Sequence, residues 1–335
     1  VYTSRSIRTS TIKNALSGHL LHSIPMRDEA PVLLLGFNRP EKMRQLINAL
    51  RTSSPQTVLI AVDGPRPSHK GDAALVQQVQ QAAGLIDWTD DVQTLFRESN
   101  LGLRIAVTQA VTWAVSRHGR VVVLEDDCIP GPTCVPFMQW GLNRYSNEKS
   151  VAHINGYNLV PRNILSRPDE PIRASRYIES YAWATWERAW TAYDDSLEWA
   201  LESPLSELAS IVESRTAAIR WKINFRDAAA GRINTWAYRW MATIWSNRWY
   251  VLAPNINLCR YDGHEGGTHT LRKARWKELP VDPSPLENPL ASAIPTNDVS
   301  ADSWTGQTVF RENWPGLLEG VLASGAMELR RRLYA

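Results

Sequence analysis

The sequence predicts an α/β fold in which a mostly parallel sheet is covered by helices on both faces. In the first half, short apolar runs of strand length alternate with segments of helical periodicity, which is typical of parallel strand–helix units. The 335 residues are enough for about two domains or one large α/β domain. With 44% hydrophobic and 21% charged residues, the composition is that of an ordinary globular protein.

Each predicted strand of the first half is an apolar run that a turn or a helix signal follows. PVLLLGF leads into Pro40, and Pro40 opens a helical pattern because proline suits the first turn of a helix. The predicted strands cover residues 31–37, 57–63, 92–96, 120–127 and 151–155. The predicted helices cover residues 40–51, 72–84, 102–116 and 133–145.

The second half is less regular and carries most of the tryptophan, with thirteen of the fifteen residues from Trp140 onward. Spacing predicts helices over 205–230 and 234–249, a strand over 250–254 and a final amphipathic helix from Asn313. The chain therefore divides into four parts. They are an arm at 1–30 with a short helix at 12–22, a regular half at 31–158, a Trp-rich half at 159–275 with a flexible loop at 260–275, and a Pro-rich segment with the last helix at 276–335.

Composition also excludes several classes of protein. The formal charge is only +3, and basic residues form no stripe, so no nucleic-acid partner is expected. Three cysteines are too few for a disulfide framework and lack zinc spacing, which favours a reducing cytoplasmic compartment. The sequence has no apolar run of membrane-spanning length, and its start lacks the apolar region of a signal peptide.

Ligands of open parallel sheets bind beyond the carboxyl ends of the strands. The residues that follow the predicted strands are therefore the candidate site. They are Phe37, Asn38, Arg39, Asp63, Gly64, Arg66, Gly102, Arg104, Glu125, Asp126, Asp127 and Asn155.

The strongest local signal is the triplet Glu125-Asp126-Asp127 after a buried strand. Adjacent carboxylates repel one another, and a bound Mg²⁺ or Mn²⁺ relieves that repulsion and can bridge a diphosphate. The alternative is a solvated acidic turn. Arg39 can pair with a phosphate oxygen, while Asp63 can accept hydrogen bonds from a base or ribose or belong to a simple Asp-Gly turn.

Three common motifs are absent from the sequence. There is no GxGxxG after the first strand, no GxxxxGK[ST] and no GxSxG. Their absence argues against a dinucleotide oxidoreductase, a P-loop protein and an α/β-hydrolase.

The order of the motifs resembles that of the nucleotide-diphospho-sugar transferases of the GT-A fold, a Rossmann-like α/β fold. NRP after the first strand, Asp-Gly after the second, NLG before a helix and EDD after the fourth carry this resemblance. It is greatest to the group of eukaryotic N-acetylglucosaminyltransferase I and the bacterial haemolytic protein-like sugar transferases, because YAWATWERAW, NTWAYRWMATIW, PNINL and GGTHT match as well. The resemblance covers about residues 30–270.

This resemblance implies a metal-dependent and inverting transfer of a sugar from a UDP donor to a hydroxyl of a glycan, a lipid-linked sugar or a small molecule. It implies that Arg39 binds the donor diphosphate, Asp63 the base, Asp126 the ribose or sugar, and Asp127 the Mn²⁺ or Mg²⁺ ion. A loop with His264 and His269 would close over the donor, with His269 reaching the metal or the phosphate. The substrate side would be lined by Trp183, Trp186, Trp236, Tyr238 and Asn155.

One residue departs from the family pattern. The family has Trp-Asp where this chain has Trp236-Ala237, and that aspartate resembles the general base that inverting transfer needs. Three explanations are open: an inactivated variant, which the matching flanks NTW and YRW favour, a natural loss of catalysis, or another carboxylate such as Glu179 or Glu187. A non-catalytic nucleotide- or carbohydrate-binding protein is therefore the alternative function, and a nucleotidyltransferase is a weaker one.

The remaining features have mainly structural interpretations. About two-thirds of the thirteen later tryptophans are expected to pack in the core. The basic end of the last helix, Arg330–Arg332, is expected to be solvated, with contact to an anionic membrane surface as the further hypothesis. The expected location is the cytoplasm, with peripheral contact at the inner membrane through this helix.

Overall fold

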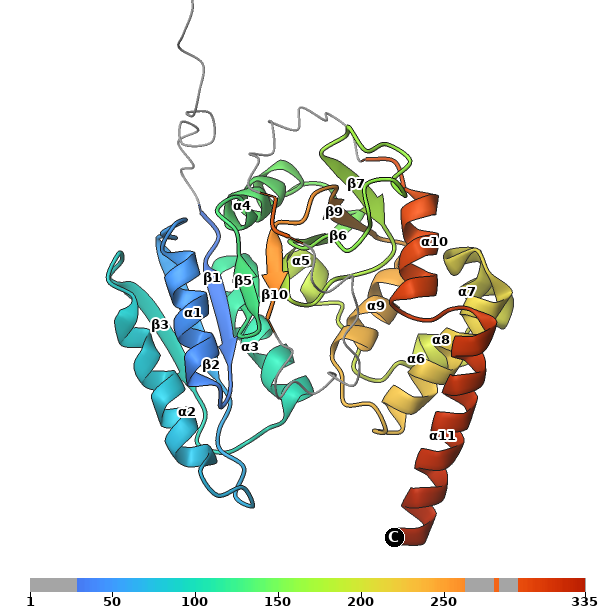
Figure 1. The fold of residues 1–335 in the computed structure, drawn as a ribbon, viewed down its shortest axis with the longest axis horizontal. Coiled ribbons are helices and arrows are strands. Elements are labelled where there is room, and N and C mark those ends of the chain that lie inside the picture. The colour runs from blue at the N-terminus through green and yellow to red at the C-terminus, as the bar shows by residue number, and fades with distance from the viewer. Residues whose placement is uncertain (1–28, 263–279, 283–294, 335) are drawn as a thin grey trace, which may run out of the picture.

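The computed structural model describes residues 29–262, 280–282 and 295–334 of the chain (Figure 1). Several sequence predictions lie outside these residues. They are the short helix at 12–22, most of the loop at 260–275 with His264 and His269, and most of the Pro-rich segment.

The centre of the molecule is an eight-stranded sheet with the strand order β3-β2-β1-β4-β8-β6-β9-β7. Its strands are β1 (Val32–Gly36), β2 (Thr57–Val62), β3 (Asp91–Phe96), β4 (Arg120–Glu125), β6 (Val151–Asn155), β7 (Ile172–Ser175), β8 (Ala182–Trp186) and β9 (Tyr250–Pro254). β8 runs antiparallel to β4 and β6, β7 runs antiparallel to β9, and the other pairings are parallel. The predicted α/β fold with a mostly parallel sheet is confirmed.

Helices cover both faces of this sheet because the side chains of each strand alternate between two hydrophobic cores. In β1, Val32 and Leu34 belong to one core, and Leu33 and Leu35 to the other. The first core packs under α1 (Pro40–Leu50), α2 (Asp72–Gln81), the 3₁₀ turn η1 (Ala82–Leu85) and α4 (Cys134–Arg144). α3 (Leu103–His118) lies on the other face, so the four predicted helices of the first half are all present.

The helices of the second half differ from the prediction in number and length. They are α5 (Glu187–Trp190), α6 (Glu198–Glu202), α7 (Leu205–Val212), α8 (Arg215–Ala229), α9 (Ala237–Ser246), α10 (Val299–Thr308) and α11 (Trp314–Tyr334). The single helix predicted over 205–230 is two helices, because Glu213 has a left-handed backbone (φ 54°) and Ser214 caps α8 through a 3.2 Å hydrogen bond from the Ala217 N–H. The helix predicted over 234–249 is the shorter α9.

A second, two-stranded sheet was not predicted from the sequence. β5 (Cys128–Pro130) pairs antiparallel with β10 (Cys259–Tyr261), and this pairing sets Tyr261 opposite Cys128. Because Cys128 follows Asp127 directly, β10 brings the chain at 261–262 beside the acidic triplet. The central sheet also crosses the sequence boundary at 158: β6 precedes the boundary, β7, β8 and β9 follow it, and the two halves share one sheet.

The tryptophans of the second half form an aromatic cluster under the sheet. Trp183 stacks on Trp236 with ring centroids 4.9 Å apart, and Trp190 contacts Trp183 at 5.7 Å and Trp240 at 4.9 Å. Trp183 and Trp240 are fully buried. The cluster ties β8 to α5 and α9 and agrees with the expectation that most of these residues pack in the core.

Candidate active site

The carboxyl ends of β1 and β4 meet at one edge of the sheet. The register sets Leu35 of β1 opposite Glu125 of β4, so the residues that follow each strand are neighbours. Arg39 Nη1 lies 3.4 Å from Asp126 Oδ1, and the Asp126 carboxylate also receives a hydrogen bond from the Phe37 backbone. The structure therefore brings together the basic and the acidic residues that the sequence placed after separate strands.

The three carboxylates of the triplet are crowded and partly withdrawn from water. Burial raises the pKa of Glu125 well above its usual range, and the negative charges of Asp127 and Asp126 raise it further. A hydrogen bond with the Trp236 side chain acts in the opposite direction. Burial and the charge of Asp127 raise the pKa of Asp126 to about 7, against the opposing charge of Arg39. Among the described residues, Glu125 Oε1 is buried without a hydrogen-bond partner.

These residues fit a divalent cation that is only partly coordinated by protein. In the described part of the chain, no group of three or more His, Cys, Asp or Glu side chains is arranged to hold a metal ion alone. Mg²⁺ is commonly held by one or two carboxylates, with phosphate and water oxygens completing its coordination. The lone buried Glu125 oxygen and the adjacent hard carboxylates suit this kind of site.

The strand β10 supplies a further wall of this edge. The Asp262 N–H donates to the Asp127 carbonyl oxygen at 2.7 Å, and Lys42 Nζ of α1 lies 2.5 Å from Asp262 Oδ2. The ring of Tyr261 lies 4.5 Å from that of Tyr181, whose carbonyl accepts a 3.0 Å hydrogen bond from the Glu125 N–H. The sequence reasoning missed these residues, because nothing in the sequence shows that β10 pairs beside the triplet.

Asp63, at the end of β2, holds a loop of its own chain. Its carboxylate accepts hydrogen bonds of 2.9–3.0 Å from the N–H groups of Gly64, Leu101 and Gly102 and from the Asn100 side chain. Gly64 allows the backbone at Ser99 to lie close to the end of β2, because a Cβ on residue 64 would lie 2.3 Å from the Ser99 backbone. Asp63 thus fixes the loop before α3, and the expected contact with a base would have to compete with these bonds.

Beyond the ends of β1 and β2, the side chains of Arg66 and Asn38 both donate hydrogen bonds to the buried carboxylate of Asp72. Arg66 Nε lies 2.6 Å and Asn38 Nδ2 2.9 Å from the Asp72 carboxylate, whose pKa Arg66 lowers well below its usual range. The Arg66 guanidinium also lies over the Phe37 ring at 5.2 Å. We call Phe37 and Arg66, which are both partly exposed, the platform; Phe37 lies two residues before Arg39.

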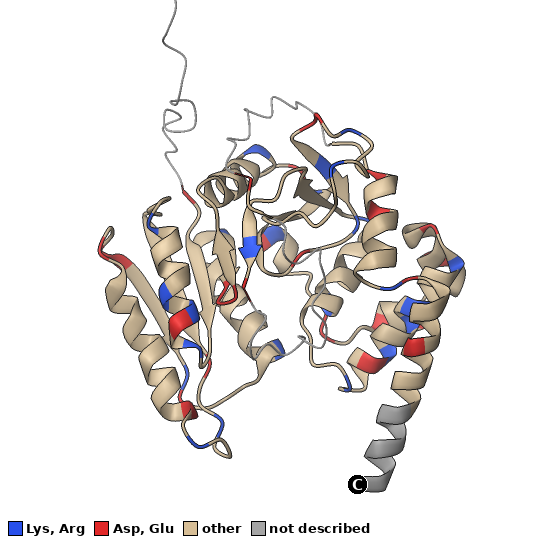
Figure 2. Ribbon diagram, in the orientation of Figure 1, with Lys and Arg blue, Asp and Glu red and all other residues tan. Residues whose placement is uncertain are grey.

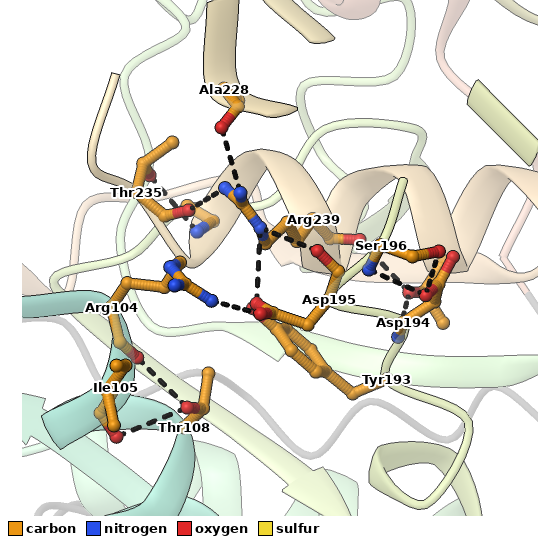
Figure 3. A network of polar contacts seen from close by, with 12 residues as sticks. Arg104, Ile105, Thr108, Tyr193, Asp194, Asp195, Ser196, Ala228, Thr235 and Arg239 are labelled. Carbon is orange, nitrogen blue, oxygen red and sulfur yellow. Dashed lines mark hydrogen bonds and ion pairs between the residues drawn. The ribbon is translucent and has the colours of Figure 1, made fainter. Parts of the chain in front are cut away.

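Arg104 belongs to a polar network that joins the two halves of the chain (Figure 3). Its guanidinium contacts Asp195, whose carboxylate also lies 3.1 Å from Arg239 Nε of α9. Arg239 is nearly buried and donates to the carbonyls of Thr235 and Ala228 as well, so it fixes Asp195 in place. A Cβ on Gly102 would lie 3.6 Å from the Asn234 side chain, which places the start of α3 beside the segment that leads into α9.

The candidate substrate residues do not all lie at this edge. Trp236 reaches Glu125, but it and Trp183 are 2% or less exposed, and Tyr238 packs edge-on against Trp221. Asn155 is buried and binds the backbone of the segment before β8, accepting from the Glu179 N–H at 2.7 Å. Trp186 pairs with Arg120 at the start of β4, so it lies at the end of the sheet opposite the triplet.

The three positions considered for a general base are separated by the fold. Ala237 is the first residue of α9, next to Trp236, and Glu187 is at the far end of β8, where its N–H donates to the Gly119 carbonyl. Glu179 lies two residues before Tyr181, whose carbonyl accepts a hydrogen bond from the Glu125 N–H. Burial raises the pKa of Glu179 to about 8, against the opposing charge of Arg173.

Comparisons with known proteins give little to add. No family profile matches the chain, and no curated protein sequence matches it significantly. Among solved structures, one match is described as the apo structure of the bifunctional glycosyltransferase WbbM, with a TM-score of 0.28 and 10% sequence identity. The match covers 57% of this chain and 36% of that one. A likeness this loose adds nothing to the geometry, on which the proposals below depend.

Proposed function

We propose that this protein is a glycosyltransferase that moves a sugar from a nucleoside diphosphate donor, UDP first among them, to a hydroxyl of an acceptor. The observation that carries the proposal is the meeting of Arg39 with the acidic triplet at the carboxyl edge of the sheet, 3.4 Å apart at Asp126. A guanidinium beside carboxylates suits a diphosphate together with a divalent cation, because each partner neutralises the other.

In this proposal the residues of the edge bind and orient the donor. Asp127 and Glu125 would hold Mn²⁺ or Mg²⁺, which, when bound, stabilises negative charge on the departing diphosphate. Arg39 would bind a phosphate oxygen directly. The platform of Phe37 and Arg66 lies next to it, where a flat base could stack. The glycan, lipid-linked or small-molecule acceptor and the cytoplasmic location remain predictions from the sequence.

We assign the general base to Glu179 in this chain. In an inverting displacement, a carboxylate takes the proton of the acceptor hydroxyl while that oxygen bonds to the anomeric carbon, and the bond to the diphosphate oxygen breaks with its electron pair. Ala237 has no group that accepts a proton. Glu179 lies two residues before Tyr181, whose carbonyl accepts from the Glu125 N–H, and burial raises the pKa of Glu179 to about 8. It would act as the base in its deprotonated form, so the rate should rise as the pH approaches 8.

The alternative is a protein that binds the nucleotide or a glycan without turnover, and Ala237 is the observation that favours it. The two functions separate in an assay of UDP release from a panel of UDP-sugars with Mn²⁺. The protein with Ala237 is expected to release UDP, and Glu179→Gln is expected to slow release at least about 100-fold. Glu187→Gln is the matched control, because Glu187 lies at the opposite end of β8, and it should retain the full rate.

The Ala237→Asp variant decides the remaining cases. Release of UDP only after this substitution would assign the base to position 237 and show that the chain is an inactivated variant. Metal-dependent binding of UDP without release in either protein would establish the binding protein instead. Absence of both binding and release would remove the proposed function altogether.

A further inference from the structure

Helix α11 exposes large apolar side chains to solvent. Trp314, Leu318, Val321 and Leu322 are 66%, 61%, 53% and 72% exposed. Their spacing of four, seven and eight residues from Trp314 places them on one face of the helix. We call these four residues the α11 face. Contiguous exposed apolar surface of this kind marks a site of interaction with a protein or a membrane.

Another side of α11 packs on α8, which lies beside it in the fold (Figure 1), and the α11 face is exposed to solvent. Leu317 is 6% exposed, and Ser324 Oγ donates to Asp227 Oδ1 of α8 at 2.7 Å. Gly320 lies so near Arg220 that a Cβ there would meet its guanidinium at 1.7 Å. The helix therefore packs on the protein through Leu317, Gly320 and Ser324, and the four bulky apolar residues of the α11 face stay exposed.

The charge around the α11 face favours an anionic partner. The sequence of α11 has two acidic residues, Glu319 and Glu328, and both carboxylate oxygens of Glu319 are paired with Arg311 at 2.6 and 2.9 Å. Three consecutive arginines, Arg330–Arg332, follow in the sequence of the same helix. On the described ribbon the two signs of charge are interspersed (Figure 2).

We infer that α11 is a peripheral membrane anchor that lies flat on a bilayer surface containing anionic phospholipid. An apolar face with a tryptophan, followed by basic residues, is the pattern of helices that bind in the plane of such an interface. Among the described helices, none has both the length and the apolar composition to span a bilayer. The inference does not depend on the proposed transferase activity, because it uses no residue of the sheet edge.

The test is co-sedimentation of the full chain with phosphatidylcholine vesicles that do or do not contain phosphatidylglycerol. Binding is expected only with phosphatidylglycerol, and high salt should weaken it. Leu318→Glu with Leu322→Glu should lower the partition coefficient at least about tenfold, because two apolar contacts are lost and two negative charges are added. Both residues are exposed, so the thermal midpoint of the variant should match that of the parent.

The matched control is Gln77→Glu with Gln81→Glu, which adds the same two charges at the same spacing on exposed positions of α2. This variant should bind vesicles as the parent does. The inference is overturned if the parent ignores anionic vesicles, or if the α11 variant binds them as well as the control does. A dimer of the parent in light scattering that the α11 variant abolishes would assign the α11 face to a second copy instead.

Discussion

The two ends of strand β8 each lie next to an aromatic side chain, but the polar groups around them differ. At its start, Tyr181 lies beside Glu125, and the neighbouring carboxylates are crowded, with one buried oxygen unpaired among the described residues. At its end, the Trp186 indole donates to the Leu142 carbonyl at 3.0 Å, and the Arg188 guanidinium donates to three backbone carbonyls. The start of β8 lies beside a buried carboxylate oxygen that can still accept a ligand, and we assign it to binding. The side chains at the end of β8 already have their hydrogen bonds within the protein, and they stabilise the fold.

The largest expected effect is on stability, at the far end of β8. Trp186→Ala should lower the free energy of unfolding by about 3–5 kcal/mol, because Trp186 is 4% exposed and its removal leaves a cavity. The UDP affinity of the protein that remains folded should not change. Denaturant unfolding and calorimetry measure the two quantities. If Trp186→Ala keeps its stability and loses UDP binding, Trp186 belongs to the binding site, and the two ends of β8 do not differ in function as described.

The second variant changes the acidic triplet, which lies beside the start of β8. Asp127→Asn should weaken Mn²⁺-dependent binding of UDP at least about tenfold, or by about 1.4 kcal/mol, because it removes a charged oxygen from the proposed cation. Its thermal midpoint should stay within about 2–4 °C of the parent, which is the shift that 1 kcal/mol produces in a domain of about 150–250 residues. Equal UDP affinity in the two proteins would contradict the role of the triplet.

A pH titration of stability examines Glu179. The folded state keeps its proton until about pH 8, while the unfolded chain loses it near the ordinary glutamate value of 4.5. The stability that this proton contributes is therefore fully present below pH 4.5 and is lost as the pH rises towards 8. The thermal midpoint of Glu179→Gln should fall less between pH 5 and pH 8 than the thermal midpoint of the parent. A parallel decline of both proteins would show that Glu179 is not held protonated by the fold.

The smallest effect is expected in the network of Figure 3. Asp195→Asn weakens the hold on Arg104, whose guanidinium contacts that carboxylate from the start of α3. The exposed part of this pairing contributes about 1 kcal/mol or less, so the thermal midpoint should fall by no more than about 2–4 °C. Thermal melts compare this variant with Arg162→Gln, which removes an exposed pair with Asp169 elsewhere. A much larger fall would mean that the pairing of Asp195 with the nearly buried Arg239 contributes more to stability than an exposed ion pair does.

The sequence predicted the fold where strands are continuous apolar runs. β1, β2, β4 and β9 have this pattern and were predicted at nearly the observed residues. β7 was missed because its four residues, IRAS, are short and include Arg173, which is buried only because the carbonyl of Pro254 and the side chains of Asn158 and Asn255 accept its hydrogen bonds. Partners so distant in sequence leave no local pattern.

The same reasoning explains which site residues were predicted. Arg39 and Asp126 follow strands that were predicted to be parallel, so their place at one edge of the sheet could be predicted, whereas the direct pairing of β1 with β4 is shown only by the structure. Trp186 was expected near them from the family resemblance, and Glu187 as an alternative general base, while the strand that carries Trp186 was not predicted. β8 is reversed, however, so its start meets the triplet and its end lies at the opposite edge. Strand direction depends on long-range pairing, and the alternation of apolar residues along the chain does not encode it.

Calorimetric titration of the full chain with UDP, in the presence and absence of Mn²⁺, examines the central claim most directly. The arrangement of Arg39 with the triplet predicts saturable binding with Mn²⁺ and a large loss of affinity when the ion is removed. Binding of equal strength without any divalent ion, or no binding under either condition, would contradict the assignment of this sheet edge to a nucleoside diphosphate.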